Sequence, residues 1–202
     1  LTGLPELSVH GLNDRDARAL LLDNMYGPLD VAVCDQIVSE SHGNPLALLE
    51  FPRTWNTAEF AGGFGFPSSQ PHTVVSKIEE SYARRLHLLA AHTQLLVVAA
   101  AAEPVGNPLL LQRAAQGLGL EMTAADPAVG AGLLKMGRRV EFAHPLVRSA
   151  AYRSASAEDR RHVHRALADA TDATADPDRR AWHRARATPG PDEEIAAELE
   201  HS

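Results

Sequence analysis

Hydrophobic residues recur at intervals of three and four along most of the chain, which is the pattern of amphipathic helices packed on a shared core. The interval is clearest where the polar positions between them carry charge, as in DRDARALLLDNM. The expected helices cover residues 14–25, 29–42, 45–52, 74–88, 93–102, 108–117, 145–154, 157–171, 177–187 and 191–200. The pattern therefore predicts a mainly α protein.

Two segments break the helical pattern. LLKMGRRVEFA, residues 133–143, has two short strand-like runs around Gly137-Arg138, which predicts a β-hairpin. GGFGFPSSQPHT, residues 62–73, combines glycine, serine and proline without periodicity, which indicates a linker and a domain boundary. Three helices followed by a hairpin is the order of a winged helix. The four helices after the hairpin resemble the start of a helical-repeat array.

Four X-Pro pairs stand at the start of predicted helices. They are Asn44-Pro45, Asn107-Pro108, Asp126-Pro127 and His144-Pro145. Proline at the first helical position has its φ preset, and an Asn or Asp before it accepts a hydrogen bond from a free backbone N–H. The motif even repeats, as GNPLALL and GNPLLL. Each pair therefore predicts the start of a helix, and contact with a ligand is the alternative interpretation.

His144 differs from the other three residues that precede these prolines. Histidine is not a favoured capping residue, so a role other than capping is expected for it. It follows a predicted strand, begins a helix, and has Arg148 one turn further on. A helix N-terminus, an imidazole and a guanidinium could together hold a phosphate or a carboxylate. The alternative is that His144 only packs beneath the hairpin.

Composition narrows the class of protein. The chain has 202 residues, of which 45% are hydrophobic and only 5% aromatic, in keeping with a helical globular protein. Its net charge of −7 argues against unspecific attraction to nucleic acid. The single cysteine, Cys34, excludes an internal disulfide and a multi-cysteine zinc site, and its position predicts packing in the core. Without a signal peptide or a long apolar run, a cytoplasmic location is expected.

The chain lacks the sequence motifs of the common enzyme classes. It has no GxxxxGK[ST], HExxH or GxSxG motif, so we expect that the chain is not an enzyme and has no metal site. The spacings of His162 with His164 and of His87 with His92 suit a shared ion poorly on a helix. The expected recognition helix, residues 127–134, has no arginine, lysine, asparagine or glutamine, so no direct DNA contact is expected. Three cations on the hairpin, Lys135, Arg138 and Arg139, are too few to change this.

Several blocks resemble the large ATP-binding LuxR-family regulators, which are signal-transduction ATPases of the STAND type. These blocks are GNPLALLEFP, LLVVAAAAEP, GLLKMGRRVEFAHPLVRSAAYRSASAEDRRHVHRALADA and DRRAWHRARATPGPDEEIAAELE. The resemblance covers nearly the whole chain. FAHPLVRSAAYR and RRHVHRALA are its most specific parts, whereas GNPLAL is shared more widely among STAND proteins.

The resemblance implies a middle portion of a longer transcription regulator. Residues 1–61 would be the end of an AAA-type ATPase core and its helical lid, 62–73 a linker, 74–143 a winged helix, and 144–202 the start of tetratricopeptide-like repeats. The partners would be the upstream ATPase core and the downstream repeats, before a closing DNA-binding domain. ATP or ADP would bind the longer protein, and no cofactor is expected for this chain alone. We expect no membrane partner, but self-association of the isolated chain through unpaired apolar surface.

The resemblance also implies a nucleotide site. Gly43 and Pro45 match the family's G-x-P motif, whose proline packs against the adenine and ribose. His144 is similar in position to a winged-helix histidine that contacts the β-phosphate of ADP in the closed state. The segment reads FAHP rather than methionine-histidine-aspartate, with Pro145 in place of the aspartate. The alternative is a helical protein-interaction module without nucleotide contact.

Overall fold

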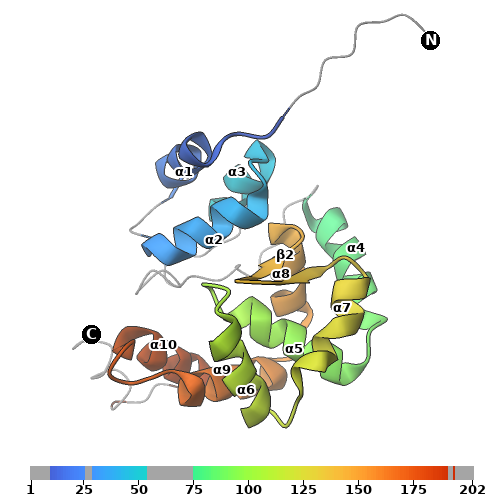
Figure 1. Cartoon of the computed structure of the whole chain (residues 1–202), viewed down its shortest axis with the longest axis vertical. Coiled ribbons are helices and arrows are strands. Elements are labelled where there is room, and N and C mark those ends of the chain that lie inside the picture. The colour runs from blue at the N-terminus through green and yellow to red at the C-terminus, as the bar shows by residue number, and fades with distance from the viewer. Residues whose placement is uncertain (1–9, 26–28, 54–74, 191–192, 194–202) are drawn as a thin grey trace, which may run out of the picture.

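The structure, a computed structural model, describes residues 10–25, 29–53, 75–190 and 193, and this part of the chain is mainly helical (Figure 1). Its helices are α1 Asp14–Asp23, α2 Val31–Ser41, α3 Pro45–Arg53, α4 Val75–His87, α5 Ala91–Ala102, α6 Pro108–Gly117, the 3₁₀ helix η2 Met122–Ala125, α7 Asp126–Gly130, α8 Pro145–Ser154, α9 Ala157–Ala170 and α10 Pro177–Ala187. The mainly α fold expected from the sequence is confirmed.

The predicted hairpin is present. Strands β1 Leu134–Met136 and β2 Val140–Phe142 pair antiparallel, with Leu134 opposite Phe142 and Met136 opposite Val140. Leu134 and Phe142 are buried, whereas Met136 is partly exposed near the turn. The hairpin therefore contributes one apolar face to the core, as the alternation of its sequence predicts.

Several predicted boundaries differ from the structure, and three of the differences have a clear physical reason. α3 runs through Pro52 and ends at Arg53, since a proline in the last turn removes only one hydrogen bond. The helix expected over 127–134 is the five-residue α7, because Leu134 already belongs to β1. Asp126 does not cap α7: it is the first helical residue, and the turn continues directly from η2. The predicted linker, 62–73, and most of the helix expected over 191–200 lie outside the described residues.

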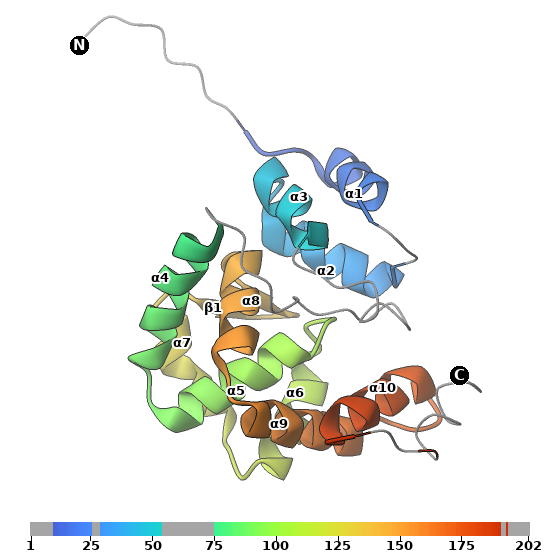
Figure 2. The ribbon, with the colours of Figure 1, turned by 180° about the vertical axis from the view of Figure 1, so that it is seen from behind.

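The helices pack in three adjoining groups (Figures 1 and 2). α1, α2 and α3 contact one another, α4 and α5 both contact α8, and α9 lies between α10 on one side and α5 and α6 on the other. One continuous apolar core runs through all three groups. It includes Leu21, Leu48, Leu96, Phe142 and Leu167.

Cys34 lies in this core with 2% of its surface exposed, as predicted, and its sulfur is 3.5 Å from Nη1 of Arg18. Burial raises the pKa of the Cys34 thiol, so the thiol stays protonated near neutral pH. None of the helices in the described ranges has the length and hydropathy needed to cross a lipid bilayer.

Candidate functional site

The turn from α2 to α3 carries the first predicted site residue, Gly43. His42 and Gly43 both have positive φ, 50° and 70°. The Gly43 carbonyl accepts a hydrogen bond of 2.8 Å from the N–H of Leu12, in the segment that leads into α1. A Cβ on Gly43 would lie 2.1 Å from the Leu12 carbonyl oxygen, so only glycine fits this turn. Gly43 is buried, which gives it a structural role before any ligand is considered.

Asn44 and Pro45 begin α3 as the sequence predicts. Oδ1 of Asn44 accepts hydrogen bonds from the N–H groups of Leu46, at 3.0 Å, and Ala47, at 3.4 Å. Pro45 is exposed, and 58% of the Leu46 surface is exposed beside it. The turn therefore presents an apolar Pro-Leu step to its surroundings.

The second GNPL motif repeats the same construction. Gly106 has φ 71°, and its carbonyl accepts a hydrogen bond of 2.8 Å from the N–H of Val140. Oδ1 of Asn107 accepts from the next two free N–H groups of α6, and Leu109 is 68% exposed. The motif is thus a helix start that also fastens the preceding turn to a distant segment.

His144 does cap α8, so the expectation that capping had not selected it is wrong. Its Nδ1 accepts a hydrogen bond of 3.1 Å from the N–H of Leu146. Nδ1 is therefore unprotonated, and the proton of the neutral ring is on Nε2. The ring is stacked on Tyr82, with 6.4 Å between centroids. Burial and then the nearby His42 lower the pKa of His144, which keeps the ring neutral.

His42 lies near His144 and contacts Lys135, a pair that the sequence does not predict. Nδ1 of His42 bonds the Ser39 carbonyl at 2.7 Å, which leaves Nε2 as an acceptor 3.5 Å from Nζ of Lys135. The first group of helices thus meets the hairpin and the start of α8 where Gly43 begins the turn. His42 ends α2 and Lys135 lies in β1, 93 positions later, so no local sequence signal marks the pair.

Arg148 does not face the same side, and its predicted contact with a bound anion is wrong. The guanidinium is buried, with Nη2 2.6 Å and Nε 3.1 Å from the two carboxylate oxygens of Glu40. Nη1 donates to carbonyl groups at the end of α5, the closest being that of Glu103 at 2.8 Å. All three nitrogens of the guanidinium donate to groups inside the protein and the side chain is buried, so Arg148 does not face a ligand at the surface.

A polar cleft borders the α2–α3 turn. It has a volume of about 510 Å³ and lies between the start of α1 and the outer side of α2. Arg18, ion-paired with Asp35, lines it together with His42 and Gly43. Of the three predicted nucleotide-binding residues, Gly43 lines this cleft.

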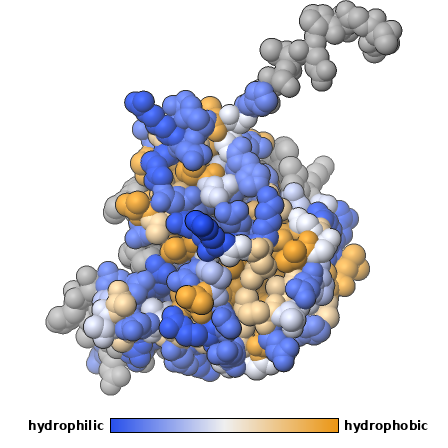
Figure 3. All heavy atoms as spheres, viewed as in Figure 1, coloured by the Kyte–Doolittle hydropathy of each residue, from blue (hydrophilic) through white to orange (hydrophobic). Residues whose placement is uncertain are grey.

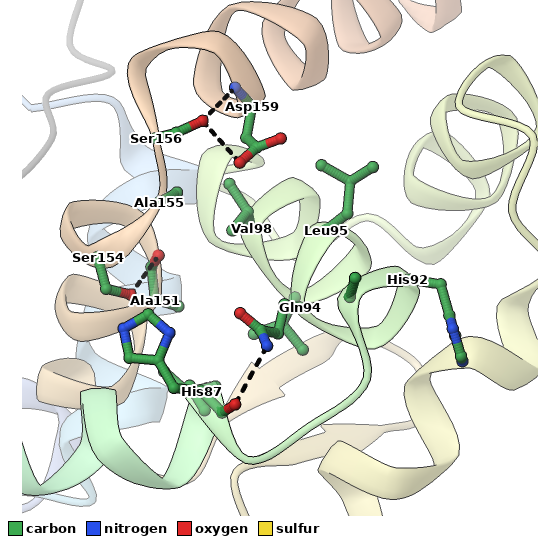
Figure 4. A pocket seen from close by; sticks show the side chains of 13 residues that line it. His87, His92, Gln94, Leu95, Val98, Ala151, Ser154, Ala155, Ser156 and Asp159 are labelled. Atoms are coloured by element: carbon green, nitrogen blue, oxygen red, sulfur yellow. Dashed lines mark hydrogen bonds between the residues drawn. The ribbon is translucent and has the colours of Figure 1, made fainter.

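A second, mostly apolar groove of about 450 Å³ lies where α4, α5, α8 and α9 meet (Figure 4). Val98 and Ala151 form part of its floor, and Gln94 and Ser154 line it with their polar groups. Those groups bond to nearby protein: Gln94 Nε2 donates to the Leu89 carbonyl at 2.7 Å. His87 and His92 lie at this groove, away from the predicted site.

No arrangement typical of a metal site appears in the described ranges, where no three His, Cys, Asp or Glu side chains are grouped suitably for an ion. His162 is exposed and His164 is buried, so the two residues point apart. His164 instead meets His183, 19 residues later, with 2.9 Å between their Nδ1 atoms. This buried histidine pair could not be predicted from sequence spacing.

Comparison of the chain with protein-family models, with curated proteins and with solved structures finds no match.

Proposed function

We propose that this chain is the lid and winged-helix portion of an ATP-dependent LuxR-family transcription regulator, and that it transmits the nucleotide state to downstream repeat and DNA-binding domains. In this proposal residues 1–61 end the ATPase core and form its lid, 62–73 link it to a winged helix over 74–143, and helical repeats begin at 144–202. ATP or ADP binds the upstream core in the cytoplasm, and this chain performs no catalysis.

The observation that carries the proposal is the hydrogen-bonding state of His144. Because Nδ1 is occupied by the Leu146 N–H, the neutral ring can offer only an N–H donor, at Nε2. No hydrogen bond to Nε2 occurs within the described part of the chain. A half-buried N–H donor at a helix N-terminus, with no partner among the described residues, is suited to a phosphate oxygen.

The exposed Pro45 and Leu46 support the same proposal from the other element. An apolar step at the end of a glycine turn can cover the flat face of a nucleobase, while the glycine lets the backbone approach closely. Gly43, Pro45 and His144 would then close over the nucleotide from α3 and α8. A switch requires such contacts to differ between the ADP and ATP states.

The two GNPL motifs provide a matched test in the longer regulator. Pro45→Ala is expected to weaken ADP binding about five- to thirtyfold, since a packed contact of this size is worth roughly 1–2 kcal/mol. Pro108→Ala removes the corresponding proline from the second motif and should leave ADP affinity unchanged. Equal affinities for both variants and the native protein would contradict a nucleotide contact at Pro45.

A second candidate is a helical protein-interaction module without nucleotide contact. Apolar side chains gather on the surface around α6 and α7 (Figure 3), where Leu109 and Val129 are exposed. Unpaired apolar surface of this kind favours association with a partner or with another copy. Light scattering of the chain over a range of concentrations tests this second candidate. It predicts that the measured mass rises with concentration, and that Leu109→Glu makes this rise smaller. A strict monomer would argue against it.

A further inference from the structure

The contact between α2 and the hairpin is made by polar side chains. Three residues of α2 bond to three successive residues of β2: Gln36 Nε2 donates to the Val140 carbonyl at 2.9 Å, Ser39 Oγ to Glu141 Oε1 at 3.0 Å, and Glu40 Oε1 accepts from the Phe142 N–H at 3.2 Å. Interfaces between parts of a chain that associate as units are typically more polar than a core. We call this contact the α2–β2 seam.

One buried ion pair stands at the end of the seam. Glu40 and Arg148 meet side by side through two hydrogen bonds, and their side chains are 1% and 7% exposed. The guanidinium also lies over the Phe142 ring, 4.9 Å from its centroid. Removing either partner would leave the other charge buried and unpaired, which is strongly unfavourable.

Arg148 is fixed from its other side by the carboxyl end of α5. Nη1 donates to the carbonyl groups of Ala101, at 3.1 Å, and Glu103, at 2.8 Å. These carbonyls have no helical partner of their own at the end of α5, and a cation there is favoured by the helix dipole. Arg148 is therefore bonded to α5 on one side and to Glu40 of α2 on the other, so it connects the group of α4, α5 and α8 with α2.

The position of this pair in α8 links it to the proposed nucleotide contact. His144 caps α8 and Arg148 lies one turn further on, while Glu40 lies in the last turn of α2, two residues before His42. We propose that the Glu40–Arg148 pair is a positioning device that sets His144 against the α2–α3 turn. This inference rests on the proposed function for its consequence, although the positioning itself can be measured without nucleotide.

Hydrogen exchange at two backbone amides of β2 measures whether the α2–β2 seam is intact, and it needs neither nucleotide nor the longer regulator. The Phe142 N–H depends on Glu40, whereas the neighbouring Val140 N–H bonds to the Gly106 carbonyl and does not involve α2. In Arg148→Met, we expect hydrogen exchange at Phe142 to accelerate at least about tenfold while Val140 keeps its protection. Arg148→Lys keeps the charge but cannot span both oxygens of Glu40 and the carbonyls of α5, so it should give an intermediate rate.

α8 supplies a matched control for the loss of an arginine. Arg153 pairs with Glu79 of α4 at 2.9 Å and makes no bond across the seam. Arg153→Met should therefore leave exchange at Phe142 unchanged. Native exchange at Phe142 in both Arg148 variants, or equal acceleration at Phe142 and Val140, would overturn the positioning role.

The consequence for nucleotide is tested in the longer regulator by combining variants. If Arg148 acts through His144, then Arg148→Lys and His144→Asn each weaken ADP binding, and the double variant is no weaker than the weaker single variant. If the losses of ADP affinity in the two single variants multiply in the double variant, Arg148 does not act through His144 and the positioning role is overturned. If His144→Asn alone has no effect on ADP, the proposed function fails, while the exchange at Phe142 still decides whether the pair holds the seam.

Discussion

His164 and His183 share a buried hydrogen bond between their Nδ1 atoms, 2.9 Å apart, although 19 residues separate them in sequence. Nε2 of His164 bonds the hydroxyl of Tyr152 at 2.8 Å, and both imidazoles are fully buried. A single proton lies between the two Nδ1 atoms, so one ring donates and the other accepts, and both rings cannot be charged at once without breaking this hydrogen bond. Burial disfavours a charge on either imidazole, so the pair joins α9 and α10 as neutral groups.

The pair predicts a loss of stability in mild acid. Burial lowers the pKa of His183 to about 3 and lowers the pKa of His164 well below its usual value. The unfolded chain binds protons at both residues near pH 6.5, and the folded chain does not. As pH falls below about 6.5, the free energy of unfolding should decrease, with a slope that approaches about 1.4 kcal/mol per pH unit for each histidine.

Urea unfolding at a series of pH values measures this slope, and His183→Leu provides the comparison. The variant removes one titrating residue and the buried Nε2 atom of His183, which has no hydrogen-bond partner within the described ranges. The slope between about pH 6.5 and pH 5 should fall by about 1 kcal/mol per pH unit on average relative to the native chain. Parallel curves would show that His183 is not buried in its neutral form.

Gly43→Ala should destabilise the chain far more than Gly119→Ala. Both glycines have φ 70°, but a Cβ on Gly43 would meet the Leu12 carbonyl oxygen, whereas nothing lies within 4 Å of one on Gly119. The positive φ alone costs about 1–2 kcal/mol, and the clash at Gly43 adds roughly 1–3 kcal/mol. Thermal or urea unfolding of the two variants gives this difference. Equal losses would mean that Leu12 does not pack on the turn.

The asparagine caps should contribute equally in the two GNPL motifs. Asn44→Ala and Asn107→Ala each remove a side-chain acceptor from a helix start, so each should lower the free energy of unfolding by about 0.5–2 kcal/mol. Asp126→Ala is the control, because Asp126 makes no capping hydrogen bond in α7. A loss at Asp126 as large as at the asparagines would contradict the assignment of the caps.

The sequence predicted much of the fold because its signals are local. The Asn-Pro starts of α3 and α6, the end of α5 before Glu103-Pro104 and the hairpin around Gly137 all depend on residues a few positions apart. Asp126-Pro127 looked like the same signal and was misleading, since η2 already supplies the turn before it. A capping residue is recognised only when its backbone leaves the helix, which sequence alone does not give.

The candidate site was less accessible to sequence reasoning because it depends on contacts between distant segments. His144 was singled out for failing the cap rule, yet its Nδ1 does cap, and the useful observation became the proton on Nε2. Arg148 was one of three groups that could hold an anion, and its guanidinium instead bonds Glu40, 108 positions earlier. Neither the polarity of an arginine nor its helical phase reveals a buried partner on another element.

The most direct test of the central claim is the affinity for ADP of the proposed longer regulator after His144→Asn. Asparagine keeps an acceptor that can cap α8 and removes the Nε2–H donor, so it separates the structural role of His144 from a role in binding. A hydrogen bond to a phosphate is worth about 1.5–3 kcal/mol, so affinity should fall about tenfold or more while thermal stability without nucleotide stays near native. Native ADP affinity in a fully folded His144→Asn protein would contradict the account.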